Sequence, residues 1–259
     1  MGAQVGLFGK STFLEQELEA WSLETWGWLM RALGGVTRLR RTPLVLANTE
    51  FFPRTDTEGD ERGRYVFETV KGWMGMADLP GRLESYDRGP INAHVATYAF
   101  VRAPGQPLGL SRVEEGEAVI TYARDLLDQP RLLIPTLAHE LSHYLVAGAL
   151  TKEPAPGGPD ALELTTELCV AYAGFGVFAA NAAFHFEGHH FAGGHGWSSR
   201  RLGYFSERSW AFALAVFLAL KGEEAPADVL KPSVADLTNK AARYLSRNPG
   251  LLEPLRRIA

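Results

Sequence analysis

His139-Glu140-Leu141-Ser142-His143 is the stretch of this 259-residue chain that decides most about its fold. It lies inside an apolar segment in which leucines recur every four residues, at positions 133, 137, 141 and 145. Residues four apart share one face of an α-helix. The segment therefore predicts a buried helix over about 128–150, with both imidazoles on one face and Glu140 beside them.

Two histidines spaced in this way on a helix are typical of a zinc site in which the adjacent glutamate acts as a base. A catalytic zinc usually takes three protein ligands and leaves a fourth position for water. Candidates for the third ligand are Asp160, Glu163 and Glu167, at the start of the next apolar helix. We favour Glu163, with Glu167 accepting the N–H of a liganding histidine. The reverse assignment and Asp160 stay open.

The rest of the chain divides into parts with different local patterns. Thr12 and Glu15 match a capping box at the start of a helix over about 11–34. A short strand is expected at 43–47, and strand patterns at 83–86, 93–102 and 117–122 predict a small, mostly antiparallel sheet. Further helices are expected at about 60–76, 159–184, 206–220 and 233–247.

Strands followed by helices favour an α+β fold. We expect a single domain spanning residues 1–259. Its parts would be the N-terminal helix at about 11–34, a sheet-rich part at about 43–123 and a helical zinc-binding part at about 124–259.

The pair His139-Glu140-x-x-His143 and Glu163-x-x-x-Glu167 resembles the gluzincin metallopeptidases, the thermolysin-like group. Glu167 stands where that group usually has aspartate. A looser likeness to uncharacterised bacterial HExxH proteins covers residues 49–53, 168–180 and 196–204, and implies no substrate. The resemblance implies a minimal gluzincin-like (zincin) core, with the HExxH active-site helix and C-terminal helices around it.

The same resemblance implies a zinc-dependent hydrolase, a metallopeptidase that cleaves peptide or amide bonds and holds one Zn²⁺. Glu140 would serve as general base. Tyr204 or His195 would donate a hydrogen bond to the oxyanion. Strand 117–122 would be the edge strand that pairs with an extended peptide or protein substrate.

Two other kinds of protein are compatible with the sequence. One is a metal-stabilised sensor or binding module with a zincin fold and little or no turnover. The other is a membrane-associated protease using 168–184 and 210–220, although both runs are short for a membrane span. The loop 184–197, rich in histidine and glycine, could hold a second metal or cover a substrate.

Composition limits the partners that we expect. A net charge of −4, with one short basic run at 38–41, disfavours nucleic acid as a partner. A single cysteine, Cys169, forms no internal disulfide, and no secretory signal is evident, so we expect a cytoplasmic protein without a membrane span. Cys169 and the tryptophans at 21, 26 and 28 fit a core or an interface, and the oligomeric state stays open.

Overall fold

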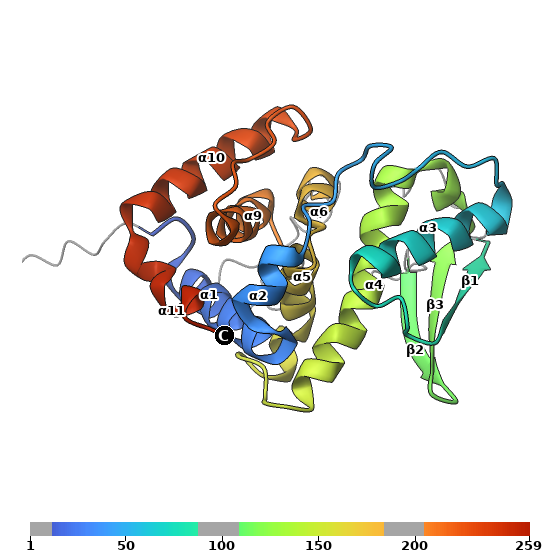
Figure 1. Ribbon diagram of the computed structural model, residues 1–259, viewed down its shortest axis with the longest axis horizontal. Coiled ribbons are helices and arrows are strands. Elements are labelled where there is room, and N and C mark those ends of the chain that lie inside the picture. The colour runs from blue at the N-terminus through green and yellow to red at the C-terminus, as the bar shows by residue number, and fades with distance from the viewer. Residues whose placement is uncertain (1–11, 88–108, 184–204) are drawn as a thin grey trace, which may run out of the picture.

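The computed structural model describes residues 12–87, 109–183 and 205–259, and the expected α+β class is confirmed in them (Figure 1). Helices form most of the described chain, and a three-stranded sheet is inserted before the long helix α4. The elements are α1 (Gln16–Leu33), α2 (Gly35–Arg41), α3 (Gly59–Trp73), β1 (Gly81–Tyr86), β2 (Gly109–Glu114), β3 (Glu117–Ala123), η1 (Arg124–Asp128), α4 (Pro130–Leu150), η2 (Pro159–Ala161), α5 (Leu162–Tyr172), α6 (Gly176–Ala182), α9 (Glu207–Lys221), α10 (Pro232–Arg247), η3 (Pro249–Leu251) and α11 (Glu253–Arg256).

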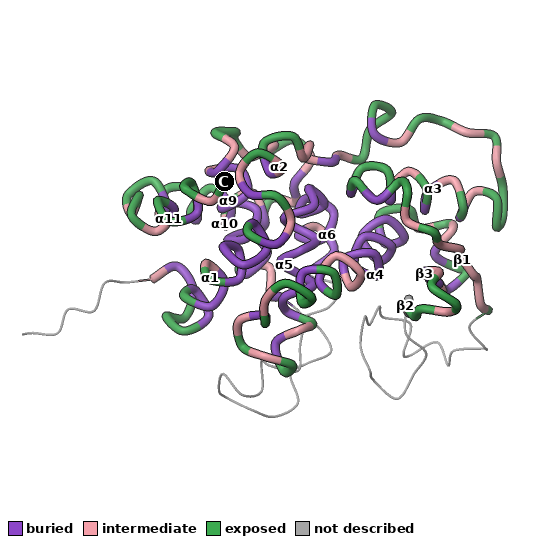
Figure 2. The backbone as a smooth tube through the Cα atoms, turned by 60° about the horizontal axis from the view of Figure 1, so that its bottom comes forward, coloured by how far each residue is buried: buried purple, intermediate pink, exposed green. Residues whose placement is uncertain are grey.

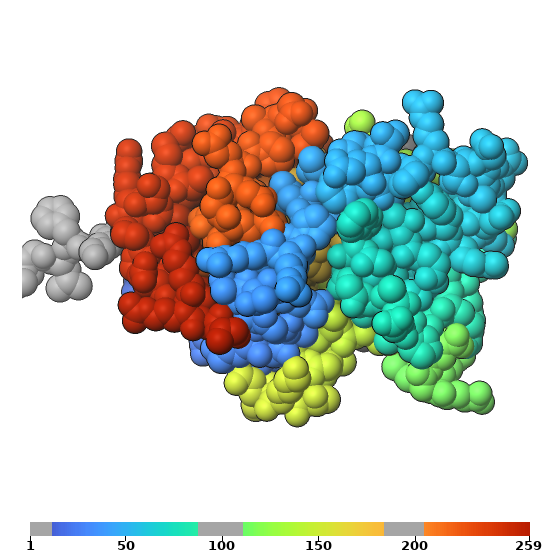
Figure 3. Space-filling model, in the orientation of Figure 1, coloured from blue at the N-terminus to red at the C-terminus, as the bar shows by residue number. Residues whose placement is uncertain are grey.

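The long helix α4 lies between the sheet, together with α3, on one side and helices α1, α5, α6 and α9 on the other (Figure 1). It packs against α5 and α6 on one side and against β2 and β3 on the other. Helix α3 lies over the sheet. The connection from α2 to α3 runs along the surface from the helical side of the molecule to the sheet side (Figure 3). The HExxH segment is thereby held in the middle of the molecule.

The sheet is mixed, which corrects the expected mostly antiparallel arrangement. The strand order is β1-β3-β2, with β1 parallel and β2 antiparallel to β3. Strand β3 is therefore central, so the prediction that 117–122 forms an edge strand is wrong. Local periodicity reports that a segment is extended, but it does not report which neighbour the segment pairs with.

The two faces of the sheet differ as period-two alternation requires. On one face of β3, Ile120 and Tyr122 are buried beside the helices. The other face carries a network of ion pairs in which Arg82 contacts Glu84, Glu114 and Glu117, and Arg112 contacts Glu84 and Glu114. These charges satisfy one another on the solvent side of the sheet.

The core lies where the helices meet, as the buried stretches of α4, α5, α6 and α9 show (Figure 2). Trp26 and Trp28 are almost completely buried, and Trp21 is 7% exposed. The indole N–H of Trp21 donates to the carbonyl of Pro156, and that of Trp28 donates to the carbonyl of Glu153. The tryptophans are therefore core residues that tie α1 to the connection between α4 and α5.

The helix expected over 159–184 is broken, and the strand expected over 43–47 does not form. Helix α5 ends at Tyr172 and α6 begins at Gly176. Between them Gly174 has a φ of 92°, and its carbonyl accepts a hydrogen bond from Val45 N–H at 2.9 Å. The extended segment around Val45 thus bonds to the helix break instead of joining the sheet.

Helix α1 begins later than the sequence suggests, because the expected capping box does not form. The Thr12 hydroxyl donates to the carbonyl of Leu14. Glu19, from within the first turn of the helix, accepts hydrogen bonds from the N–H groups of Phe13 and Leu14 instead. A carboxylate near a helix N-terminus also suits the helix dipole.

No helix among the described residues combines the length and the apolar character that a membrane crossing requires. The segment 93–102, expected to be a strand, lies outside the described residues.

Candidate metal centre

Helix α4 carries the two histidines and is buried along its middle, from 132 to 142. It begins with Pro130 at its first position, where the missing N–H costs nothing, and Pro135 lies inside it. The hydroxyls of Thr136 and Ser142 donate to the carbonyls four residues earlier, at Leu132 and Ala138. These internal bonds let polar side chains sit in an apolar environment without an unsatisfied donor.

Helix α5 faces α4 and carries three polar residues on one side. Glu163, Thr166 and Glu167 are spaced three and four apart, so they share a helix face. The helix follows a tight turn in which Gly157 and Gly158 have positive φ. This turn brings the polar face of α5 over the histidines of α4.

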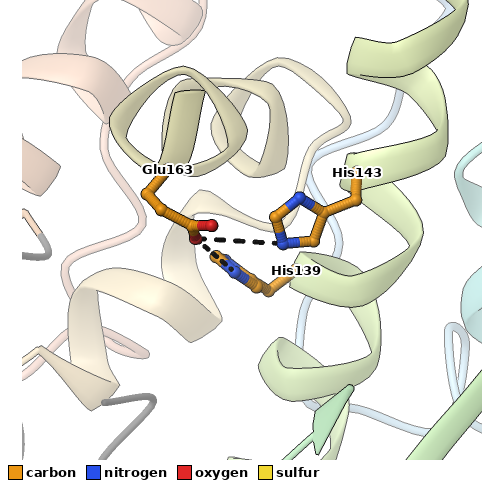
Figure 4. A group of neighbouring side chains, drawn as sticks. All are labelled: His139, His143 and Glu163. Atoms are coloured by element: carbon orange, nitrogen blue, oxygen red, sulfur yellow. Dashed lines mark ion pairs between the residues drawn. The ribbon is translucent and has the colours of Figure 1, made fainter. Parts of the chain in front are cut away.

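His139, His143 and Glu163 converge from the two helices (Figure 4). Oε2 of Glu163 lies 3.6 Å from Nε2 of His139 and 3.9 Å from Nε2 of His143. One ligand atom from each of the three residues lies within 4.8 Å of the others. Donors bound tetrahedrally to zinc at about 2.0–2.1 Å are separated by roughly 3.3 Å, so the observed spacing is close to what a shared zinc needs.

The site opens to solvent at one end. His139 is 4% exposed, while the side chain of His143 is 31% exposed and that of Glu163 is 62% exposed. A catalytic metal needs a side that water and substrate can reach. Since exposure increases from His139 to His143 to Glu163, a metal held between them would be open on the side of Glu163.

The electrostatics of the site favour positive charge at its centre. Burial alone would lower the pKa of His139, but the carboxylates of Glu163, Glu167 and Glu140 outweigh burial and raise that pKa to about 9. Burial and repulsion from His139 lower the pKa of His143 to about 4. An imidazole that favours its cation despite full burial indicates surroundings suited to a metal cation.

Glu140, the expected general base, is 5% exposed and has a raised pKa. Burial is the main cause, and the nearby Glu163 carboxylate adds to it. His139 and a hydrogen bond from the Ser111 side chain on β2 oppose the shift. A carboxylate with a raised pKa takes up a proton more readily at neutral pH.

Glu167 lies behind His139, on the Nδ1 side of its ring. Its Oε1 is 3.6 Å from Nδ1 of His139, on the side of the ring away from Glu163. Glu167 is 5% exposed, and burial raises its pKa to about 7 against the influence of His139. Of the two arrangements left open by the sequence, the geometry matches Glu163 between the Nε2 atoms and Glu167 behind one ring.

Asp160, Tyr204 and His195 are the remaining candidates from the sequence, and the structure describes one of them. Asp160 lies in η2 and, in the described part of the chain, does not join the three clustered side chains. Tyr204, His195 and the loop 184–197 lie outside the described residues.

Sequence reasoning missed two residues that touch the site, Ser111 and Thr166. Ser111 could not be found, because strand β2 was not expected. Thr166 had a signal: it follows Glu163 by three residues on the same helix, so it belongs to the same face.

Comparison of the chain with protein-family models, with curated proteins and with solved structures gave no match in any of the three. Its function is therefore inferred from the chemistry of the site residues themselves.

Proposed function

We propose that this protein is a zinc-dependent hydrolase of peptide or amide bonds, with a gluzincin-like core and one Zn²⁺ held by His139, His143 and Glu163. The observation that carries the proposal is the convergence of these side chains from α4 and α5 at 3.6 and 3.9 Å. Two imidazoles and one carboxylate are a ligand set typical of catalytic zinc in metalloproteases.

The residues around the metal position can each take a different role in hydrolysis. When bound, zinc supplies Lewis acidity, which polarises a substrate carbonyl and makes a water molecule more acidic. Glu140 takes a proton from the attacking water as the C–O bond forms, and delivers it to the leaving nitrogen as the C–N bond breaks. The raised pKa of Glu140 makes its carboxylate a better proton acceptor in the first of these steps. Tyr204 and His195 stay predicted oxyanion donors.

Of the two strands that pack against α4, β2 supplies the side chain that contacts Glu140. Ser111 of β2 contacts Glu140, and the Tyr144 hydroxyl of α4 donates to the carbonyl of Arg112 at 2.5 Å. Because β2 pairs with β3 on one side, it lies at an edge of the described sheet. An extended substrate that pairs with the sheet next to the site would therefore pair with β2.

The presence of Glu140 favours a hydrolase over a metal-stabilised sensor. A structural zinc is usually closed by four protein ligands and needs no base. Among the described residues three side chains form the cluster, and a buried carboxylate lies next to it.

Replacing Glu140 with glutamine tests the proposal. Glu140→Gln removes the base but keeps the shape and the neighbouring ligands, so zinc content should stay at the wild-type level. Turnover of a peptide library, followed by mass spectrometry, should fall by about 10²–10⁴-fold. His143→Ala is the control that loses both zinc and turnover. Equal turnover in Glu140→Gln and wild type would contradict the mechanism, and zinc binding without turnover in wild type would favour a sensor.

A further inference from the structure

Helix α5 contains two neighbouring threonines that make the same local bond but differ in what else they face. The Thr165 hydroxyl lies 3.0 Å from the carbonyl of Ala161, and the Thr166 hydroxyl lies 2.9 Å from the carbonyl of Leu162. Both side chains are fully buried. Of the two, Thr166 also faces Nδ1 of His143, at 3.4 Å.

The direction of the Thr166 hydroxyl hydrogen decides whether Thr166 donates to His143 or accepts from it. A threonine hydroxyl has a single hydrogen to donate and two lone pairs that accept. The shorter contact directs that hydrogen to the carbonyl of Leu162, which can only accept. In that arrangement the Thr166 oxygen would accept from His143, and Nδ1 of His143 would carry the hydrogen. The lone pair of Nε2 would then point to the side that faces Glu163.

We propose that Thr166 is a positioning residue that holds His143 in the Nδ1–H tautomer, with Nε2 directed toward the metal position. The inference rests on the proposed zinc site and adds to it a residue that touches neither metal nor substrate. A hydrogen bond to the outer nitrogen of a liganding histidine fixes its tautomer and ring orientation. Helix α5 would then supply both a ligand, Glu163, and the residue that orients another ligand, His143.

The two histidines would then be supported by different chemistry. His139 has the Glu167 carboxylate behind Nδ1, whereas His143 has a neutral hydroxyl. A neutral acceptor orients the ring of His143 without adding a further negative charge to a site that already has Glu140, Glu163 and Glu167 around it.

Three variants separate positioning from packing. Thr166→Val keeps the β-branched shape and removes the hydroxyl, and Thr166→Ser keeps the hydroxyl. Thr165→Val is the matched control, because it removes the same kind of buried bond to the preceding turn without touching a histidine contact. If Thr166 only packs, the two valine variants should behave alike in every measurement.

The first readout is zinc affinity of the full chain, measured by competition with a chromophoric chelator at pH 7. Thr166→Val should bind zinc about 10–100-fold more weakly than wild type. Thr166→Ser should recover most of that loss, and Thr165→Val should bind like wild type. Thermal unfolding of the metal-free variants shows whether both valine variants remain folded. Equal zinc affinity of Thr166→Val and Thr165→Val would overturn the inference while leaving the zinc site in place.

The second readout is the tautomer of His143 in the metal-free protein, from two-bond ¹⁵N–¹H correlation spectra. Wild type and Thr165→Val should show the Nδ1–H form, and Thr166→Val should shift toward Nε2–H. A wild-type protein that binds no zinc would contradict the proposed function, and the tautomer comparison would then decide the role of Thr166 alone. An unchanged tautomer in Thr166→Val would contradict the inference in either case.

Discussion

Glu163 and Glu167 lie one helical turn apart, yet they reach opposite nitrogens of the same imidazole. Glu163 lies near Nε2 of His139 and Glu167 near Nδ1, each at 3.6 Å. We expect Glu167→Gln to keep its zinc but to bind it about 10–100-fold more weakly. Chelator competition measures the difference. Loss of zinc in Glu167→Gln with retention in Glu163→Gln would show that the two roles are reversed.

Cys169 is a packing residue on α5 rather than a nucleophile. It is completely buried, and burial raises the pKa of its thiol to about 12. Because the thiolate is the reactive form, the native protein should react with iodoacetamide far more slowly than a free thiol does. Labelling in and out of urea, followed by mass spectrometry, should show modification only after unfolding. Rapid labelling of the native protein would contradict this packing of α5.

At the scale of elements, the break between α5 and α6 depends on one glycine. A Cβ atom at Gly174 would lie 2.1 Å from the carbonyl oxygen of Pro43, in addition to the strain of its φ of 92°. Gly222, at the end of α9, has a φ of 73° and no atom within 4 Å of such a Cβ. Gly222→Ala should therefore cost about 1 kcal/mol of stability, and Gly174→Ala clearly more.

Urea unfolding of the two glycine variants measures this difference in the free energy of unfolding. Equal costs at both positions would mean that the chain near Pro43 moves away without penalty. The break would then not depend on that contact.

Helices whose apolar and polar residues recur at regular helical spacing could be predicted from the sequence. Helix α4, with its histidines four apart, follows from local spacing, and so does the shared face of Glu163 and Glu167. The broken helix could not be predicted in this way, because its apolar run continues through Gly174 and the break depends on contacts with Pro43 and Val45, which are distant in the sequence. The parallel pairing of β1 with β3 is equally non-local.

The residues around the site differ in the same way: some follow from local spacing and others depend on distant parts of the chain. Thr166 could be found from the helical period of α5, whereas Ser111 reaches Glu140 from a strand that local pattern did not indicate. The start of α1 differs from expectation because the Thr12 hydroxyl donates to the carbonyl of Leu14. Glu19 accepts from the N–H groups of Phe13 and Leu14, which precede the helix.

At the scale of the whole molecule, the metal position lies between two helices that belong to the buried core. A ligand that binds the folded state and not the unfolded state stabilises the fold by about 4 kcal/mol at a thousand times its Kd. Zinc added to the metal-free protein at that excess should raise Tm by roughly 10 °C. Glu140→Gln should keep this shift and His143→Ala should lose it in differential scanning fluorimetry. An equal shift in His143→Ala would place the stabilising zinc elsewhere.

We propose that His139, His143 and Glu163 together hold one zinc ion. Elemental analysis of wild type, His143→Ala and Glu163→Ala, each purified without added metal, tests it most directly. We predict about one zinc per chain in wild type and strongly reduced zinc in both variants. A wild-type protein that contains no metal and takes none up, or variants that keep the full zinc content, would contradict the account.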